Sequence, residues 1–158
     1  MFGSESLEKF GSIKVEEKRF SAKEVNKLLG AHDVKPSKKM GQNFVIDANI
    51  PEKLVRLWGI DKTCSILEIG AGLGALTLQL SKAAEHVTAV ELDTRLMPIL
   101  REVLGDCSNV DLLQGDILKL DIGKLAAETM RGTNRHVCAN LPYNITTPAL
   151  TKPSGSTS

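Results

Sequence analysis

The four residues Asn140-Leu141-Pro142-Tyr143 are of types that could align an aromatic amine for reaction. The side-chain carbonyl of Asn140 and the backbone carbonyl of Leu141 can accept the two N–H bonds of an exocyclic amine on a nucleobase. That amine is a poor nucleophile because its lone pair is delocalised, and these acceptors would aim the lone pair at an electrophile. Pro142 stiffens the turn and Tyr143 can stack on an extruded base. We predict these four as the catalytic residues; the alternative is an Asn-Pro turn with a packed tyrosine.

A glycine-rich turn, Gly70-Ala71-Gly72-Leu73-Gly74, follows a predicted buried strand over Ser65–Ile69. Glycines let the backbone turn tightly and approach a ligand with no Cβ in the way. The run fits the pyrophosphate turn of dinucleotide enzymes and equally the cofactor turn of S-adenosylmethionine (SAM) enzymes. Three glycines at this spacing argue against a turn that only packs helix on strand. The turn therefore predicts a nucleotide-like cofactor without choosing between NAD and SAM.

Two acidic residues lie at or just after the ends of the next two predicted strands. Glu91 ends a strand over His86–Glu91, where a carboxylate can accept both ribose hydroxyl protons, one per oxygen. Asp116 follows a strand over Val110–Leu113 and can accept the adenine amino hydrogen, with Ile117 packing on the ring. Taken alone, Asp116 fits a turn or helix cap equally well. Together with the turn and Glu91, the binding interpretation is favoured, and an acid at this position is common in SAM enzymes and less expected in NAD enzymes.

The elements that position these residues alternate between strand and helix after residue 65. A fourth strand ends before Asn140, and helices are predicted around Leu76–Ala83, Thr94–Leu104 (with Asp93 as its cap and a possible kink at Pro98) and Ile122–Met130. Strands that alternate with helices imply right-handed crossovers and a parallel sheet. The predicted fold class is therefore α/β, with a partial parallel sheet made of the first four strands.

Two shorter helices are predicted before the first strand. Ser21 and Glu24 form a capping box for a helix that Gly30 would end. Asp47 or Asn49 would cap a second helix, closed by Gly59. The predicted organisation is an N-terminal extension over 1–20, a cofactor-binding domain over 21–150 and a linker-like tail over 151–158.

Composition is that of a globular domain: 158 residues, 42% hydrophobic and 25% charged. No apolar run reaches the roughly 20 residues of a membrane span. The three cysteines and three histidines are too scattered for a disulfide framework or a metal site, so we expect no metal and a cytoplasmic location. Basic residues dominate between Lys9 and Lys39, and acidic residues between Glu85 and Glu128. Charge alone favours a solvated surface over a nucleic-acid site.

The chain resembles the small-subunit type of ribosomal RNA adenine N6,N6-dimethyltransferase. The resemblance covers about Ser21 to Leu150 and rests on five segments in family order: Lys38–Asp47, Glu68–Thr77, Val90–Asp93, Gly115–Ile117 and Asn140–Tyr143. The Gly-Gln-Asn-Phe and Asn-Leu-Pro-Tyr motifs are its specific parts. The resemblance implies a Rossmann-like class I SAM methyltransferase fold, and dimethylation of adenosines in the RNA of the small ribosomal subunit.

The resemblance also implies roles for individual residues. The cofactor-binding set would be Gln42, Asn43, Val45, Gly70, Ala71, Gly72, Glu91, Leu92, Asp116, Ile117 and Asn140. Asn140 would touch both SAM and the target base, with Leu141 and Tyr143 holding the base. Three basic residues, Lys35, Lys38 and Lys39, would lie near RNA.

The later strands and the C-terminal RNA-binding domain of that family have no counterpart here, so we expect a cofactor-binding part of a longer protein. The fragment would bind SAM, with doubtful activity alone, and its fourth strand would present an unpaired edge through which it could dimerise. The alternatives are a large-subunit RNA adenine methyltransferase of the macrolide-resistance type, a non-catalytic RNA-binding or ribosome-assembly factor, and an NAD-dependent oxidoreductase. The last leaves the Asn-Leu-Pro-Tyr motif unexplained.

Overall fold

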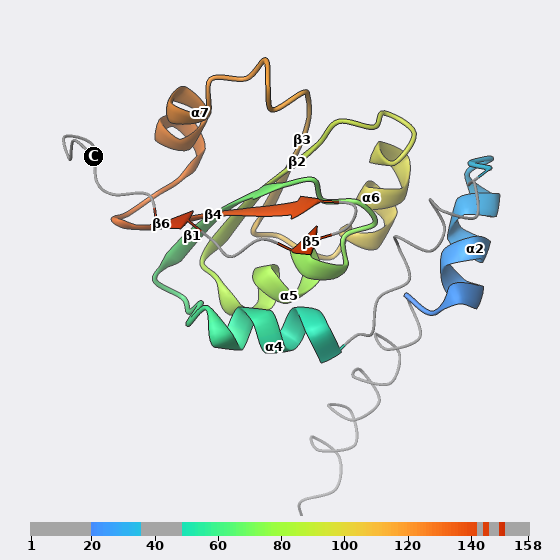
Figure 1. The fold of residues 1–158 in the computed structure, drawn as a ribbon, viewed down its shortest axis with the longest axis horizontal. Coiled ribbons are helices and arrows are strands. Elements are labelled where there is room, and N and C mark those ends of the chain that lie inside the picture. Colours follow the sequence, from blue (N-terminus) through green and yellow to red (C-terminus); the bar gives the residue numbers. More distant parts are fainter. Residues whose placement is uncertain (1–19, 36–48, 142–143, 146–148, 151–158) are drawn as a thin grey trace, which may run out of the picture.

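The fold is an α/β sheet with helices on both faces (Figure 1). The computed structural model describes residues 20–35, 49–141, 144–145 and 149–150. In chain order the elements are α2 (Ala22–Ala31), α4 (Asn49–Leu57), β1 (Cys64–Ile69), α5 (Ala75–Ala83), β2 (His86–Glu91), α6 (Met97–Val103), β3 (Val110–Gln114), α7 (Ile122–Thr129), β4 (Asn134–Leu141), β5 (Asn144–Ile145) and β6 (Ala149–Leu150). Residues 1–19 and the predicted tail lie outside the described residues, so the domain limits remain predictions.

Four parallel strands form the sheet, in the order β3-β2-β1-β4. Ile69 at the end of β1 pairs with Val90 on one side and with Ala139 on the other. Glu91 pairs with Gln114 at the end of β3. The predicted α/β class and the partial parallel sheet are therefore confirmed, and all four strands end at the same edge.

The outer edge of β4 is paired at four of its eight residues, which corrects the prediction that this edge is wholly unpaired. β5 pairs antiparallel with Asn140 and Leu141, and β6 pairs antiparallel with His136 and Val137. Backbone N–H and C=O groups at a sheet edge need partners. Here the chain turns back after β4 and supplies them itself, which a search for further parallel strands does not anticipate.

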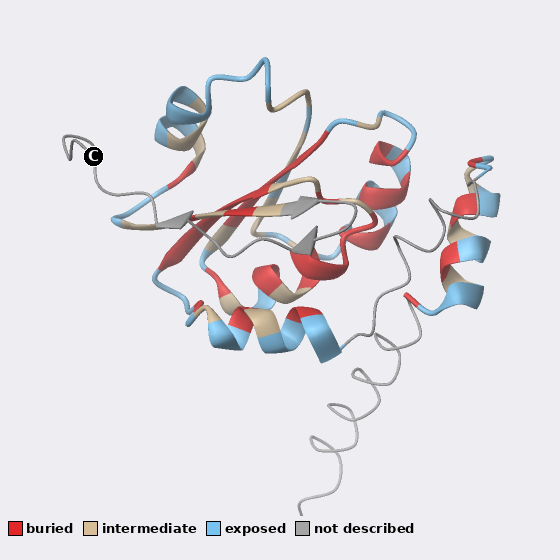
Figure 2. Cartoon of the chain, in the orientation of Figure 1, coloured by how far each residue is buried: buried red, intermediate tan, exposed pale blue. Residues whose placement is uncertain are grey.

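Burial along the strands alternates between two clusters on opposite faces of the sheet. Ile66 and Cys138 face the α5 residues Leu76 and Leu80, while Leu67, Val90 and Val137 pack with Met130 and with Leu125 of α7. Figure 1 accordingly shows α5 and α7 on opposite sides of the sheet, and Figure 2 shows the buried strands between them. This core fixes the strand ends that carry the candidate site.

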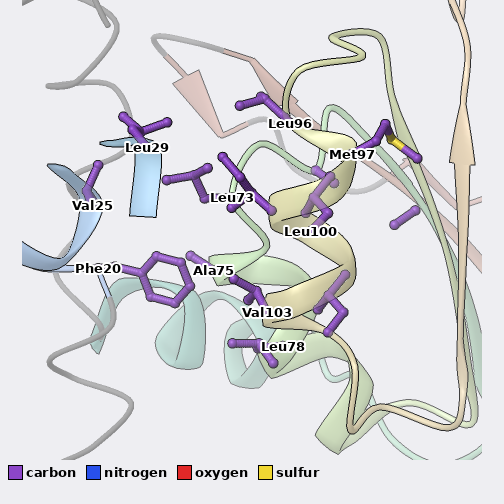
Figure 3. Packing of buried hydrophobic residues seen from close by; sticks show 14 of the residues in the cluster. Phe20, Val25, Leu29, Leu73, Ala75, Leu78, Leu96, Met97, Leu100 and Val103 are labelled. Carbon is purple, nitrogen blue, oxygen red and sulfur yellow. The ribbon is translucent and has the colours of Figure 1, made fainter. Parts of the chain in front are cut away.

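The N-terminal helix α2 packs on the far side of α6 from the sheet. Phe20, Val25 and Leu29 are buried in one cluster with Leu73 of the glycine turn and Leu100 of α6 (Figure 3). Ser21 caps α2 by accepting the Glu24 N–H at 3.3 Å, which confirms half of the predicted capping box. The cluster joins α2 to the turn after β1, since Leu29 lies 44 residues before Leu73 in the sequence.

Two helix boundaries differ from the sequence predictions. α2 continues through Gly30, and the left-handed residue that follows it is Asp33, with φ of 55°. α6 begins at Met97, so Pro98 lies in the first turn and no kink is needed, because a first-turn proline loses no intrahelical hydrogen bond.

Asn49 is the first residue of α4 rather than its cap, and the alternative cap, Asp47, lies outside the described residues. Gly59 follows α4 with φ of 66°, as predicted for the residue that closes a helix. Among the described residues, no helix is both long and apolar enough to cross a membrane.

Candidate functional site

The candidate site lies at the sheet edge where β1, β2, β3 and β4 end. Gly70 directly follows β1, and its N–H donates to the carbonyl of Val90 in β2 at 2.8 Å. The Gly115 N–H donates to the carbonyl of Glu91 at 3.0 Å, which ties the chain after β3 to the end of β2. Ligands of open α/β sheets bind outside the carboxyl ends of the strands, where such loops meet. The structure thus brings the glycine turn, Glu91 and the Gly115-Asp116 segment to one edge.

The glycine turn adopts a backbone that other residues reach only with strain. Gly70, Gly72 and Gly74 have φ values of 80°, 59° and 90°, all in the region that lacks a steric penalty only for glycine. A Cβ at Gly74 would also meet Leu100 and Val103 of α6 at 3.3 Å. Gly74 caps α5 with its backbone alone. The spacing of the three glycines is therefore required by conformation, and at Gly74 by packing as well.

Glu91 is held rigidly by the turns on either side of it. Its Oε1 accepts the Gly72 N–H at 2.8 Å and its Oε2 accepts the Asp93 N–H at 2.8 Å. The side chain is buried, with 8% relative exposure. A carboxylate has about four acceptor positions, so each oxygen keeps capacity for one more donor. The predicted use of one oxygen for each ribose hydroxyl is compatible with this geometry.

Asp116, Ile117 and Leu92 are further members of the predicted cofactor-binding set that the structure describes. The Asp116 Oδ1 accepts the Leu118 N–H at 2.9 Å, and its backbone carbonyl accepts from Lys119 and Leu120. Asp116 thus closes a local turn, which was the alternative to a cofactor contact at this position. Its half-buried carboxylate retains Oδ2 as an acceptor for a ligand. Ile117 is half-buried, whereas Leu92 is 60% exposed.

Asp93 does not cap α6 directly. Its Oδ1 accepts the Arg95 N–H at 2.9 Å, and its Oδ2 receives the Arg95 guanidinium at 2.7 Å. The hydrogen bond from Arg95 lowers the pKa of Asp93. The residue at the N-cap is Leu96. Asp93 therefore stabilises the turn between β2 and α6, and its own N–H orients Glu91.

The predicted catalytic segment is described only in part. The backbones of Asn140 and Leu141 belong to β4 and pair with β5. Ala139 pairs with Ile69, so the backbone of the next residue, Asn140, lies beside that of Gly70 at the edge of the sheet where the site lies. Pro142 and Tyr143 lie outside the described residues, as do Lys38, Lys39, Gln42, Asn43 and Val45. Lys35 is described and exposed, just after the buried Val34 that anchors the end of α2.

Glu68 was not among the residues predicted for the site, although an acid within an apolar strand was a signal for a role. Its side chain is fully buried in β1, and the Thr77 hydroxyl donates to its Oε2 at 2.5 Å. Burial, opposed by the Thr77 hydrogen bond and assisted by the nearby Glu91 charge, raises the pKa of Glu68 to about 8. Burial and the Glu68 charge likewise raise the pKa of the Cys138 thiol to about 12. A buried acid, Glu68, therefore lies next to the candidate site in addition to Glu91.

The described residues contain no group of three or more His, Cys, Asp or Glu side chains placed to hold a metal ion. What they do assemble is a left-handed glycine turn, an anchored carboxylate and a second acid with apolar neighbours. These are suited to the sugar hydroxyls and the base of an adenosine-bearing ligand.

Comparison with known proteins identifies the relatives of this arrangement. The family model described as "Ribosomal RNA adenine dimethylase" matches residues 34–153. "Ribosomal RNA small subunit methyltransferase A" of Shouchella clausii (strain KSM-K16) is 48% identical over 128 residues, which cover 80% of this chain and 43% of that protein. The protein of the same name from Alkaliphilus oremlandii (strain OhILAs) is 42% identical over 132 residues, covering 84% of this chain and 46% of that protein. The chain thus spans less than half the length of these relatives.

Solved structures are similar at a lower level. The 23S rRNA methyltransferase ErmE has a TM-score of 0.47 at 22% identity, with 60% of this chain and 46% of that chain covered. A dimethyladenosine transferase from Plasmodium falciparum has a TM-score of 0.44 at 20% identity, with 58% and 41% covered.

Proposed function

The chain belongs to the ribosomal RNA adenine dimethylase family, and from that premise we propose that it binds SAM at the ends of β1 to β4. The activity proposed for the complete protein is N6,N6-dimethylation of adenosines in the RNA of the small ribosomal subunit. This chain alone is proposed to retain cofactor binding, with weak or no methylation activity. A cytoplasmic location goes with this proposal.

The observation that carries the proposal is the anchored Glu91 carboxylate. Gly72 and Asp93 each donate an N–H to one of its oxygens at 2.8 Å, so the acceptor atoms are fixed before any ligand arrives. Binding to a preorganised group avoids the entropic cost of ordering it. Glu91 is proposed to accept hydrogen bonds from the ribose hydroxyls. The turn residues Gly70, Ala71 and Gly72 are proposed to face the methionine end of the cofactor. Leu92 is proposed to pack near the sugar and the base.

The proposed adenine site is formed around Asp116. Asp116 is held by the Leu118 N–H through one oxygen, and its other oxygen is proposed to accept the adenine amino hydrogen, with Ile117 against the ring. Gln42, Asn43 and Val45 are proposed to line the same site from the segment after α2, whose anchor is the buried Val34.

The proposed chemistry needs alignment rather than a strong base. SAM supplies an activated methyl group when it is bound. Asn140 and Leu141 are proposed to accept the two N–H bonds of the target amine through their carbonyls, and Pro142 and Tyr143 to fix and stack the base. Proximity and orientation of this kind can account for a large part of a transfer barrier.

The proposed macromolecular partner is ribosomal RNA. Lys35 is exposed a few residues after the end of α2. With Lys38 and Lys39 it would contact RNA phosphates, since cationic side chains dominate affinity for RNA and DNA backbones.

Cofactor binding is tested by isothermal titration calorimetry of this chain with S-adenosylhomocysteine, with NAD as the control. We expect saturable binding of S-adenosylhomocysteine only. Binding of NAD alone would favour the oxidoreductase alternative, and binding of neither ligand by a folded chain would contradict the proposed site.

Substrate choice is tested by methyl transfer from labelled SAM to fragments of small-subunit and large-subunit ribosomal RNA, with the dimethylated nucleoside identified by mass spectrometry. The protein used is the chain extended to the full length of its relatives, with the Asn140→Ala variant as control. We expect transfer to the small-subunit RNA and its loss in the variant. Transfer to large-subunit RNA would favour the macrolide-resistance type, and no transfer would favour a non-catalytic RNA-binding role.

We also propose that two copies of this chain can associate along β4. The two-residue strands β5 and β6 pair with only part of that eight-residue strand. Sedimentation velocity over a hundredfold range of concentration tests this, and a monomer at every concentration would contradict it.

A further inference from the structure

Glu68 has too few partners for a buried carboxylate. It lies at the level of Ala89 in β2 and Cys138 in β4, and its side chain has no solvent exposure. Thr77, in the first turn of α5, donates to one oxygen, while Oε1 has no hydrogen-bond partner. An ionised carboxylate with an unsatisfied oxygen is costly in a water-free interior.

The charged surroundings of Glu68 make ionisation still less favourable. The Glu91 carboxylate on β2 acts on it with like charge, and on β4 its register partner is Cys138, whose thiol bears no positive charge. From α5 it meets the uncharged Thr77. Within the described part of the chain, no lysine, arginine or histidine is paired with Glu68, so nothing there offsets a negative charge. The raised pKa of about 8 agrees with this geometry.

We propose that Glu68 is a neutral positioning residue in the unliganded chain, and that it releases its proton to solvent when a cationic cofactor occupies the glycine turn. The neutral carboxyl joins β1 to the first turn of α5 through Thr77, across the Gly70–Gly74 turn that lies between them. Glu68 therefore acts on the cofactor through the shape and the charge of the turn.

The direction of the effect follows from the charges. SAM carries a sulfonium and an ammonium group, and a positive charge near Glu68 favours the ionised form of that carboxyl. Binding is then coupled to proton release, so affinity rises with pH up to the pKa of the free chain. This inference takes the identity of the ligand from the proposed function, but its first test needs no ligand.

The first test is the pH dependence of stability for the wild-type chain and Glu68→Gln. A folded-state pKa of about 8 lies above the ordinary glutamate pKa of 4.5. The neutral Glu68 therefore contributes stability that is fully present below pH 4.5 and lost as the pH rises to 8. We expect wild-type stability to fall relative to that of Glu68→Gln across this window. Parallel curves for the two proteins would overturn the proposal.

A measurement on the wild-type chain covers the case in which the variant does not fold. The carboxyl carbons of glutamates labelled with carbon-13 report ionisation directly by NMR. We expect one glutamate with a titration midpoint near pH 8. If every glutamate in the folded chain titrates below pH 6, the proposal is wrong.

The second test measures proton release at pH 7 by titration calorimetry with SAM in two buffers of different ionisation enthalpy. Wild type should release more protons than Glu68→Gln, with a difference approaching one proton. Below the pKa of Glu68, the affinity of wild type for SAM should increase by up to about tenfold for each unit of rising pH, and that of Glu68→Gln should not show this increase. The variant also corrects for titration of the ligand's own amino group. Equal release by both proteins would overturn the coupling, whereas failure of either protein to bind SAM, with the stability result intact, would count against the proposed function alone.

Discussion

The backbone N–H of Gly72 donates a hydrogen bond to Oε1 of Glu91 at 2.8 Å. This bond joins the turn after β1 to the carboxylate at the end of β2, 19 residues later. The turn and the carboxylate therefore act as one unit, because the turn holds the oxygen that the ligand is proposed to meet. The Asp93 N–H fixes the other oxygen from the opposite side.

Replacement of Glu91 by Gln should break this unit. A glutamine has one acceptor oxygen for two N–H donors, so its amide group would face either Gly72 or Asp93 donor to donor. We expect a loss of about 1–3 kcal/mol in the free energy of unfolding and at least about tenfold weaker binding of S-adenosylhomocysteine, which corresponds to about 1.4 kcal/mol. Thermal unfolding and calorimetry measure the two effects. The exposed Glu85→Gln is the matched control, and wild-type affinity in Glu91→Gln would contradict the assigned role.

Gly74→Ala and Gly30→Ala should change stability in opposite directions. Gly74 has φ of 90°, and its Cβ would meet Leu100 and Val103 at 3.3 Å, so we expect a loss of about 1–3 kcal/mol. Gly30 lies in α2 with nothing within 4 Å of an added Cβ, and alanine there should gain about 0.5–1 kcal/mol. Urea unfolding of both variants tests the pair. A Gly74→Ala chain as stable as wild type would show that the left-handed turn is not required.

Two leucines test the attachment of α2. Leu29 is fully buried against the glycine turn and α6, whereas Leu57 at the end of α4 is 79% exposed. Leu29→Ala should cost about 2–5 kcal/mol, and Leu57→Ala should change stability by less than about 0.5 kcal/mol. Because Leu73 of the turn lies in the same cluster, Leu29→Ala should also weaken binding of S-adenosylhomocysteine. Hydrogen exchange in α2 and calorimetry measure these effects; unchanged exchange in Leu29→Ala would disprove the docking of α2.

Two aspartates that each accept one local backbone N–H separate structure from binding. Asp116 accepts the Leu118 N–H at 2.9 Å, and Asp121 accepts the Lys124 N–H at 3.0 Å as the cap of α7. Asparagine can keep either bond through its carbonyl oxygen, but its amide group cannot accept an adenine amino hydrogen. We expect Asp116→Asn to bind S-adenosylhomocysteine about tenfold more weakly, a loss of about 1.4 kcal/mol, and Asp121→Asn to bind normally. Equal affinities would remove Asp116 from the site.

Several parts of the fold follow from the sequence because they depend on local chemistry. Strand and helix periodicity predicted the order of the elements, and the parallel β3-β2-β1-β4 sheet confirms that prediction. Three glycines at Gly70, Gly72 and Gly74 predicted a tight turn after the first strand, and the structure places all three there with positive φ values. The position of Glu91 at the end of β2 was likewise readable, because a strand of known direction places its last residue at a known edge.

Other features depend on groups that meet only when the chain is folded. The partners of Glu91, the packing of α2 on the turn and the two short strands on β4 join segments distant in the sequence. The boundary at Met97 and the turn at Asp93 were mispredicted because Pro98 and an acid fit more than one local pattern. The sequence by itself determined the class of fold and the residues able to bind an adenosine-bearing cofactor. Only the tertiary structure decided how Glu91 is held and that Glu68 is buried beneath the turn, because desolvation and hydrogen bonding depend on neighbours that the sequence does not place.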